Sequence, residues 1–279
     1  VYSDIGFIVL GEIVERFYSK ATDNVSFLNA LSLTTFRQTL GMEYTDFLST
    51  LFPGARTYVR TDHPWYRNQE WTKIAPTENV RGQASYLGST FMGELKQGDE
   101  ILRGSVHDPT AFRMGGVAGH AGLFSTADDL ARYCQMILNG GVAPGGAGGN
   151  LSGSEGALAR KGSTSRTLPT GRVSASSARR ILSAQTIAKM TAAYVVSETG
   201  ETRGLGWEIN TSFSTNRGEL FPLGSFGHTG FTGTGIWIDP VSQTFVVFLS
   251  NRVHPDGKGD VGPLRAKVAT VVASAIEDT

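Results

Sequence analysis

Residues 226–240 read Phe-Gly-His-Thr-Gly-Phe-Thr-Gly-Thr-Gly-Ile-Trp-Ile-Asp-Pro, and this stretch decides the fold of the chain. Its apolar end leads through Asp239 and Pro240 into a second β-rich run at 244–249. Two such runs joined by a short turn-forming segment predict an antiparallel hairpin. The glycines beside the polar triplet at 228–230 would let the backbone approach a ligand closely. The alternative is a glycine-rich edge strand that carries a surface histidine.

The composition is that of a neutral globular chain. It has 279 residues, of which 40% are hydrophobic and 18% charged, enough for one large domain or two lobes. Its formal net charge is zero, which removes the electrostatic case for nucleic acid or an anionic membrane as the main partner. No apolar run approaches the roughly 20 residues that span a bilayer. The single cysteine, Cys134, lies among apolar residues, which favours a buried thiol over a nucleophile.

Helices are predicted before and after the strands. Residues 5–17 carry apolar side chains at nearly helical spacing, with Asp4 as a cap, and 39–51 is a second helical candidate. A closing helix is expected over 264–276. Strands gather late in the chain, so the predicted class is α+β, with an antiparallel sheet flanked by helices.

The helix that follows Thr126 has the clearest signals. Residues 126–129, Thr-Ala-Asp-Asp, approximate a capping box with Asp in the usual Glu position. The acidic pair suits the positive end of the helix dipole, and the glycine pair at 140–141 ends the helix.

We expect one domain over 1–279, in three parts. Residues 1–141 form a mostly helical and irregular lobe. Residues 142–179 are poor in large apolar side chains and rich in Gly and Ser, which predicts a flexible insertion. Residues 180–279 supply the sheet and the closing helix.

An ordered set of motifs resembles the serine β-lactamase and penicillin-binding-protein superfamily, in its esterase and amidase branch. The matching segments lie at 2–13, 116–130, 204–207, 226–230 and 251–255. The resemblance implies a β-lactamase/transpeptidase-like fold and acyl transfer through a serine ester. Residues 106–108 together with 119–122 look like a subgroup that includes cell-wall amidases acting on muramyl peptides.

The resemblance also implies a set of site residues. Tyr2 takes the place of the family tyrosine beside the nucleophile, a proton shuttle. His228 takes the place of the strand lysine, and it would carry a charge only part of the time near neutral pH. This favours a neutral ester or amide over strong anchoring of a carboxylate. Tyr2 and His228 are therefore the predicted catalytic residues.

Four further residues are predicted to bind substrate by the same resemblance. Asp4 stands where the family usually has Asn, and an ionised Asp can accept hydrogen bonds but cannot donate them. Thr229 would line the site, and Gly230 would let the strand lie close to the acyl group. The backbone N–H of Phe231 would be the strand's oxyanion donor.

No metal or cofactor is expected. His107, Asp108 and His120 lack the compact spacing of a metal motif, so we interpret the histidines as structural groups among tight turns. The expected partner is a small-molecule or peptide substrate, without nucleic acid and without a membrane span. The resemblance alone favours a periplasmic or secreted location.

The family nucleophile is missing from the sequence. No Ser-x-x-Lys occurs, and Thr186-Ile187-Ala188-Lys189 has the spacing with the wrong first residue and in the wrong place. The family places this motif upstream of the residue that Tyr2 resembles. We therefore expect a truncated portion of a serine hydrolase of esters or amides, perhaps of cell-wall muramyl peptides. This chain alone should be inactive and poorly soluble.

Two alternatives remain open. The chain is a non-catalytic relative that binds peptidoglycan fragments or a protein partner, or it is a hydrolase that uses a different nucleophile. The second alternative would need a serine activated by His120 or His228.

Overall fold

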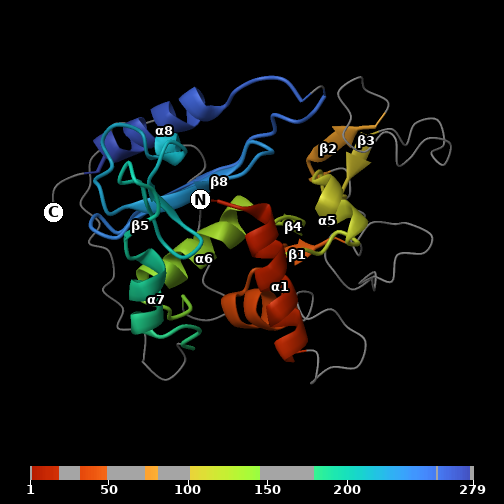
Figure 1. The fold of residues 1–279 in the computed structure, drawn as a ribbon, viewed down its shortest axis with the longest axis horizontal. Coiled ribbons are helices and arrows are strands. Elements are labelled where there is room, and N and C mark those ends of the chain that lie inside the picture. The colour runs from red at the N-terminus through yellow and green to blue at the C-terminus, as the bar shows by residue number, and fades with distance from the viewer. Residues whose placement is uncertain are drawn as a thin grey trace, which may run out of the picture.

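The computed structural model describes residues 2–18, 32–48, 73–80, 101–144, 179–255 and 257–276. The helices are α1 (Asp4–Tyr18), the π-helix η2 (Ser32–Thr39), α5 (Pro109–Arg113), α6 (Ala127–Leu138), α7 (Ala184–Thr191), the 3₁₀-helix η4 (Ser214–Arg217) and α8 (Gly262–Ser274). The strands are β1 (Asp46–Phe47), β2 (Pro76–Asn79), β3 (Ile101–Arg103), β4 (Leu123–Phe124), β5 (Tyr194–Val195), β6 (Thr202–Arg203), β7 (Glu208–Asn210), β8 (Phe226–Thr229), β9 (Gly235–Asp239) and β10 (Thr244–Phe248). Figure 1 shows α8 on one side of the main sheet and α6 and α7 on the other.

The main sheet has six strands in the order β10-β9-β8-β7-β6-β5, and every neighbouring pair is antiparallel. The predicted hairpin is β9 and β10, with Ile238 opposite Phe245. Asp239 closes its turn, because its carboxylate accepts hydrogen bonds from the backbone N–H groups of Val241 and Ser242. The predicted antiparallel sheet flanked by helices, and with it the α+β class, is confirmed.

Successive residues of β9 point to opposite faces of the sheet, as a strand requires. Trp237 packs with Phe221 and Ala269 on the face that α8 covers. Ile238 packs on the opposite face, against side chains from α6 and α7. Both faces of the sheet are therefore covered by helices.

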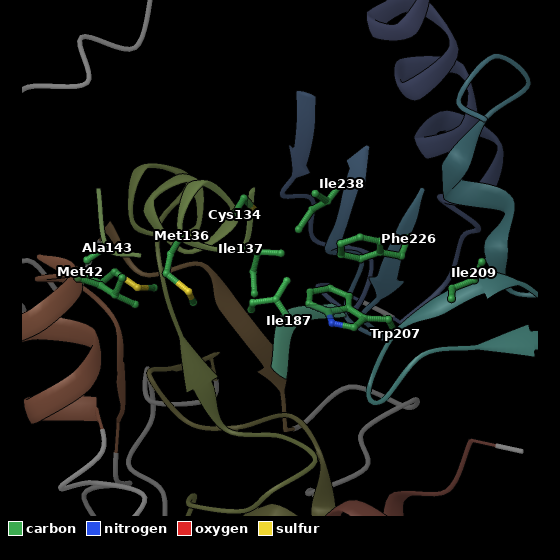
Figure 2. Close-up of a cluster of buried hydrophobic side chains, with 11 residues drawn as sticks. Met42, Cys134, Met136, Ile137, Ala143, Ile187, Trp207, Ile209, Phe226 and Ile238 are labelled. Atoms are coloured by element: carbon green, nitrogen blue, oxygen red, sulfur yellow. The ribbon is translucent and has the colours of Figure 1, made fainter. Parts of the chain in front are cut away.

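The larger core cluster joins α6 and α7 to the sheet (Figure 2). Cys134 and Ile137 project from α6, and Trp207 and Phe226 meet them from the sheet in an edge-to-face pair with ring centroids 5.2 Å apart. The Cys134 side chain is fully buried, and burial raises the pKa of its thiol to about 12. The prediction of a buried thiol is confirmed.

Helix α6 begins where the sequence predicts, because the Thr126 hydroxyl accepts a hydrogen bond from the Asp129 backbone N–H. The second half of the capping box differs from the prediction. The Asp129 carboxylate accepts hydrogen bonds from the Tyr44 backbone N–H and the Thr45 hydroxyl, both at 2.8 Å. The buried carboxylate therefore ties α6 to the segment at 41–48, and burial raises its pKa.

The predicted helix over 39–51 is wrong for residues 41–48, and 49–51 lie outside the described residues. Gly41 adopts a positive φ of 68° just after η2, and β1 then pairs with β4. Met42 and Leu48 are buried. Met42 and Leu48, whose spacing suggested one helical face, thus belong to two different core clusters.

Most of the predicted insertion at 142–179 also lies outside the described residues. Its two ends are described, and they lie side by side: Val142 bridges Arg180, and the Ala143 N–H donates to the Arg179 carbonyl. The division into three parts stays a prediction.

Helix α1 confirms the helix predicted over 5–17, with one change at its start. Ser3 supplies the cap, since its hydroxyl accepts from the Gly6 N–H at 3.4 Å, and Asp4 lies in the first turn. The side chains of Ile5, Val9, Leu10 and Ile13 are exposed. Across the described ranges, no helix is long and apolar enough to cross a membrane.

Gly119 brings a loop against the backbone of α1. A Cβ atom at this position would lie 2.1 Å from the Phe7 carbonyl oxygen and 3.2 Å from Gly11 Cα. Only glycine fits such an approach without moving the helix. The contact therefore sets the position of α1, and with it that of Tyr2.

Replacing Gly119 by Ala should lower the free energy of unfolding by about 1–3 kcal/mol, because the added methyl group overpacks the contact with α1. Gly6→Ala is the matched control, since the nearest atom to its new methyl group is Ser3 Cβ at 3.9 Å. The control should be neutral or stabilising by about 0.5–1 kcal/mol, because Ala favours a helix over Gly. Urea unfolding followed by circular dichroism measures both, and equal effects would contradict the close packing.

Candidate active site

The His-Thr-Gly triplet begins in an inner strand of the main sheet. His228 and Thr229 are on β8, which pairs with β9 on one side and β7 on the other. Gly227 permits this pairing, because a Cβ there would lie 2.1 Å from the Ile236 carbonyl oxygen and 2.3 Å from the Trp237 ring. The alternative of an edge strand is therefore wrong.

Gly230 follows at the end of β8 and turns the chain toward β9. Its N–H donates to the Thr234 carbonyl at 2.8 Å, and a Cβ would lie 2.3 Å from the Thr234 hydroxyl oxygen. The close neighbour that explains this glycine is thus Thr234. Its predicted contact with an acyl group stays a prediction.

The structure brings Tyr2 to His228, although 226 positions separate them in the sequence. Their ring centroids are 5.3 Å apart, and the Tyr2 ring also lies 5.5 Å from that of Phe7. In Figure 1 the start of α1 lies beside β8. Tyr2, Asp4, His228 and Thr229 therefore belong to one region, where α1 begins and β8 ends.

The Tyr2 phenol is held in its neutral form. Desolvation, a hydrogen bond to Asp4 and the negative charges of Asp4 and Asp108 raise the pKa of Tyr2 to about 12, while the positive charge of Arg203 opposes the shift. An ionised Asp4 carboxylate can accept a hydrogen bond from the phenol but cannot donate one. A neutral phenol can donate one hydrogen bond and accept others near neutral pH.

Two charged residues of this region escaped the sequence analysis. Arg203 on β6 and Glu208 on β7 are buried and lie opposite each other in the sheet, with Arg203 Nη1 3.6 Å from Glu208 Oε1. Glu208 Oε1 is also 3.9 Å from His228 Nε2. Burial raises the pKa of Glu208. The signal was available, since Arg203 and Glu208 directly flank the family motif at 204–207.

Phe231 lies in the turn after the triplet, and its half-exposed ring is stacked with another aromatic group. The His107 ring is 5.7 Å from it, centroid to centroid, and the Arg252 guanidinium is 4.5 Å from its centre. Arg252 also donates to the Phe231 carbonyl at 3.2 Å. The neighbouring Asn251 donates to the Pro76 carbonyl at 2.7 Å, which joins this turn to β2. Sequence analysis missed the role of Arg252.

His120 and Asp108 form a structural pair. Asp108 Oδ1 is 2.9 Å from His120 Nε2, and it also accepts the Ala111 N–H that begins α5. This confirms the interpretation of His120 as a histidine hydrogen-bonded among turns. Among the described residues, no group of three or more His, Cys, Asp or Glu side chains could hold a metal ion. A further histidine of the sequence, His63, lies outside the residues that the structure describes.

Tyr2 should remain a phenol where an ordinary tyrosine ionises. At about pH 10 a tyrosine of ordinary pKa is half ionised, whereas a pKa of about 12 leaves about 1% as phenolate. The phenolate absorbance of the chain and of its Tyr2→Phe variant should therefore be almost equal, with circular dichroism confirming that both are folded. A loss of half a tyrosine equivalent in the variant would contradict the neutral environment.

The chain is similar in sequence to known proteins. A family model described as Beta-lactamase matches residues 1–270. Two relatives, from Salmonella gallinarum and Salmonella enteritidis, carry the name "Putative D-alanyl-D-alanine carboxypeptidase" and are each 30% identical over 260 residues. The alignments cover 91% of this chain and 45% of each relative, so the chain spans about half their length.

A solved structure of a beta-lactamase from Mycobacterium bovis is similar at 20% identity, with a TM-score of 0.46, over 98% of this chain and 64% of that one. The match of the family model covers nearly the whole chain. This chain belongs to the beta-lactamase family of serine hydrolases.

Proposed function

We propose that the protein to which these residues belong hydrolyses an ester or amide through a serine acyl-enzyme. The observation that carries the proposal is the meeting of Tyr2 and His228, whose ring centroids are 5.3 Å apart. Thr229 ends β8, and Gly230 and Phe231 follow it in the turn toward β9. This meeting of residues far apart in sequence supports the proposal that they form two adjoining walls of an acyl-transfer site.

Each wall has a role in the proposed reaction. The neutral Tyr2 phenol would relay a proton between the nucleophile and the leaving group. The backbone N–H of Phe231 would stabilise the oxyanion, and the contacts of Arg252 with this residue would hold the turn in place. Asp4 would keep the Tyr2 hydroxyl oriented through the hydrogen bond between them.

The attacking serine is the part that this chain does not supply in the family's form. None of the 279 residues begins a Ser-x-x-Lys motif. We assign the nucleophile to a part of the protein outside these residues, so that the chain alone does not form an acyl-enzyme. The same absence favours the second candidate, a non-catalytic relative that binds peptidoglycan fragments.

The proposed substrate is a cell-wall peptide. The Salmonella relatives carry a carboxypeptidase name for a D-alanyl-D-alanine bond, and the resemblance to cell-wall amidases at 106–108 and 119–122 indicates the same class. A peptide amide in a muramyl peptide is therefore the substrate to test first, with a simple ester as its neutral comparison.

The test uses the gene product extended beyond these 279 residues. It should release D-alanine from a muramyl peptide or hydrolyse the ester, and Tyr2→Phe should lower kcat by about 10²–10⁴-fold because the proton relay is lost. Tyr194→Phe, at an exposed position on the edge strand β5, is the matched control and should keep full activity. Peptide binding without any turnover would favour the non-catalytic relative. Full activity of Tyr2→Phe would overturn the role of Tyr2.

A further inference from the structure

A buried cation lies beside the His-Thr-Gly strand, at a position that no motif assigns. The Arg203 side chain is only 10% exposed, and its guanidinium contacts three groups of the candidate site. Nη2 is 3.3 Å from His228 Nε2, and Nη1 is 3.6 Å from Glu208 Oε1. The central carbon of the guanidinium is 5.6 Å from the centre of the Tyr2 ring, within the range of a cation–π contact.

The strand register brings Arg203 and Glu208 together. Arg203 on β6 is opposite Glu208 on β7, and Glu208 is opposite Gly227 on β8, next to His228. Three adjacent strands thus contribute the cation, the anion and the imidazole. The pairing accounts for the meeting of Arg203 with Glu208, and the contact of Arg203 with His228 is given by the distance of 3.3 Å between Nη2 and Nε2.

The chemistry of these contacts selects one form of the His228 ring. A guanidinium has N–H donors and no acceptor, so the facing Nε2 of His228 must be the acceptor and carry no proton. The other ring nitrogen, Nδ1, is 2.8 Å from the Thr229 carbonyl oxygen, which can only accept. Both contacts are satisfied together by the neutral tautomer that has its proton on Nδ1.

The other neighbours of the His228 ring do not favour a different tautomer. Glu208 Oε1 is 3.9 Å from Nε2, beyond hydrogen-bond length, and it is also close to Arg203. A proton on Nε2 would point at the guanidinium. Tyr2 faces the ring at a centroid distance of 5.3 Å, and the charge of Arg265 lowers the pKa of Glu208.

We propose that Arg203 is the permanent cation of this site and a positioning residue that holds His228 as the Nδ1–H tautomer. The assignment rests on the proposed function for its part in catalysis. His228 then lines the site without exchanging a proton through Nε2. Arg203 takes over the positive charge that a strand lysine would supply. Because a guanidinium stays protonated, this charge does not titrate near neutral pH.

The same cation acts on Tyr2. Its positive charge lowers the pKa of Tyr2, against the burial and the Asp4 contact that raise it. It therefore favours release of the phenolic proton, the direction that a proton relay needs. Arg203 therefore contacts both rings of the candidate site, the imidazole of His228 and the phenol ring of Tyr2.

The tautomer can be measured on this chain without any substrate. Long-range ¹H–¹⁵N spectra of ¹⁵N-histidine-labelled chain at about pH 8, where an ordinary imidazole is neutral, separate protonated from unprotonated ring nitrogens. His228→Gln identifies the signals. We expect His228 Nδ1 protonated and Nε2 unprotonated. A proton on Nε2 in the unaltered chain would overturn the proposal, whatever any variant does.

Paired variants test whether Arg203 is the cause. Glu208→Gln keeps the guanidinium and should keep the Nδ1–H form. The double variant Arg203→Met/Glu208→Gln removes the guanidinium without leaving a buried carboxylate unpaired, and it should lose the preference for Nδ1–H. A purely structural role would not move the tautomer. An unchanged tautomer in the folded double variant would overturn the role of Arg203.

Activity of the extended gene product separates this inference from the proposed function. The double variant should show a changed pH dependence of kcat/KM, because the guanidinium no longer faces His228 Nε2. An Nδ1–H tautomer in a protein that never turns over substrate would refute the proposed function and leave the assignment of Arg203 intact. An active enzyme whose His228 carries its proton on Nε2 would support the proposed function and refute the assignment of Arg203.

Discussion

The pairing of β8 with β9 is the constraint on which the rest of the structure depends. Gly227 has no room for a side chain between the Ile236 carbonyl and the Trp237 ring. This close contact allows Trp237 to anchor α8 on one face while Ile238 joins the core beneath α6 and α7. It also sets His228 in an inner strand, where neighbouring strands surround its backbone. One register therefore determines both the core and a wall of the site.

Burying the charges of Arg203 and Glu208 close to β8 costs free energy, and the pairing of the two residues offsets part of that cost. Arg203 and Glu208 lose solvent, and their mutual attraction repays part of that loss because they face each other across β6 and β7. Buried pairs of this kind contribute little net stability, so the contacts that the two residues make with their neighbours matter more here. Here the neighbours are His228 and Tyr2, the two rings of the candidate site.

The sequence predicted those parts of the fold whose signals are local. The hairpin around Asp239 and the start of α6 at Thr126 follow from turn and cap chemistry, and both are confirmed. The helix expected over 39–51 is wrong for residues 41–48, because Met42 and Leu48 are buried in separate core clusters and their spacing does not reflect a helical face.

The partners of the buried charges could not be predicted in the same way. Asp129 bonds to Tyr44 and Thr45, 84 or 85 positions away, and Arg203 meets His228 only through the sheet. Tyr2 and His228 were predicted from a family resemblance, which implied that they share a site. Spacing alone could not place two such distant residues side by side.

The central claim is that this chain carries the tyrosine and strand walls of a serine hydrolase without its attacking group. Intact mass spectrometry after incubation of the chain with a fluorophosphonate probe, and separately with a penicillin, tests it most directly. The account predicts no adduct with either reagent. A stoichiometric adduct, mapped by peptide analysis to a serine within these 279 residues, would contradict it.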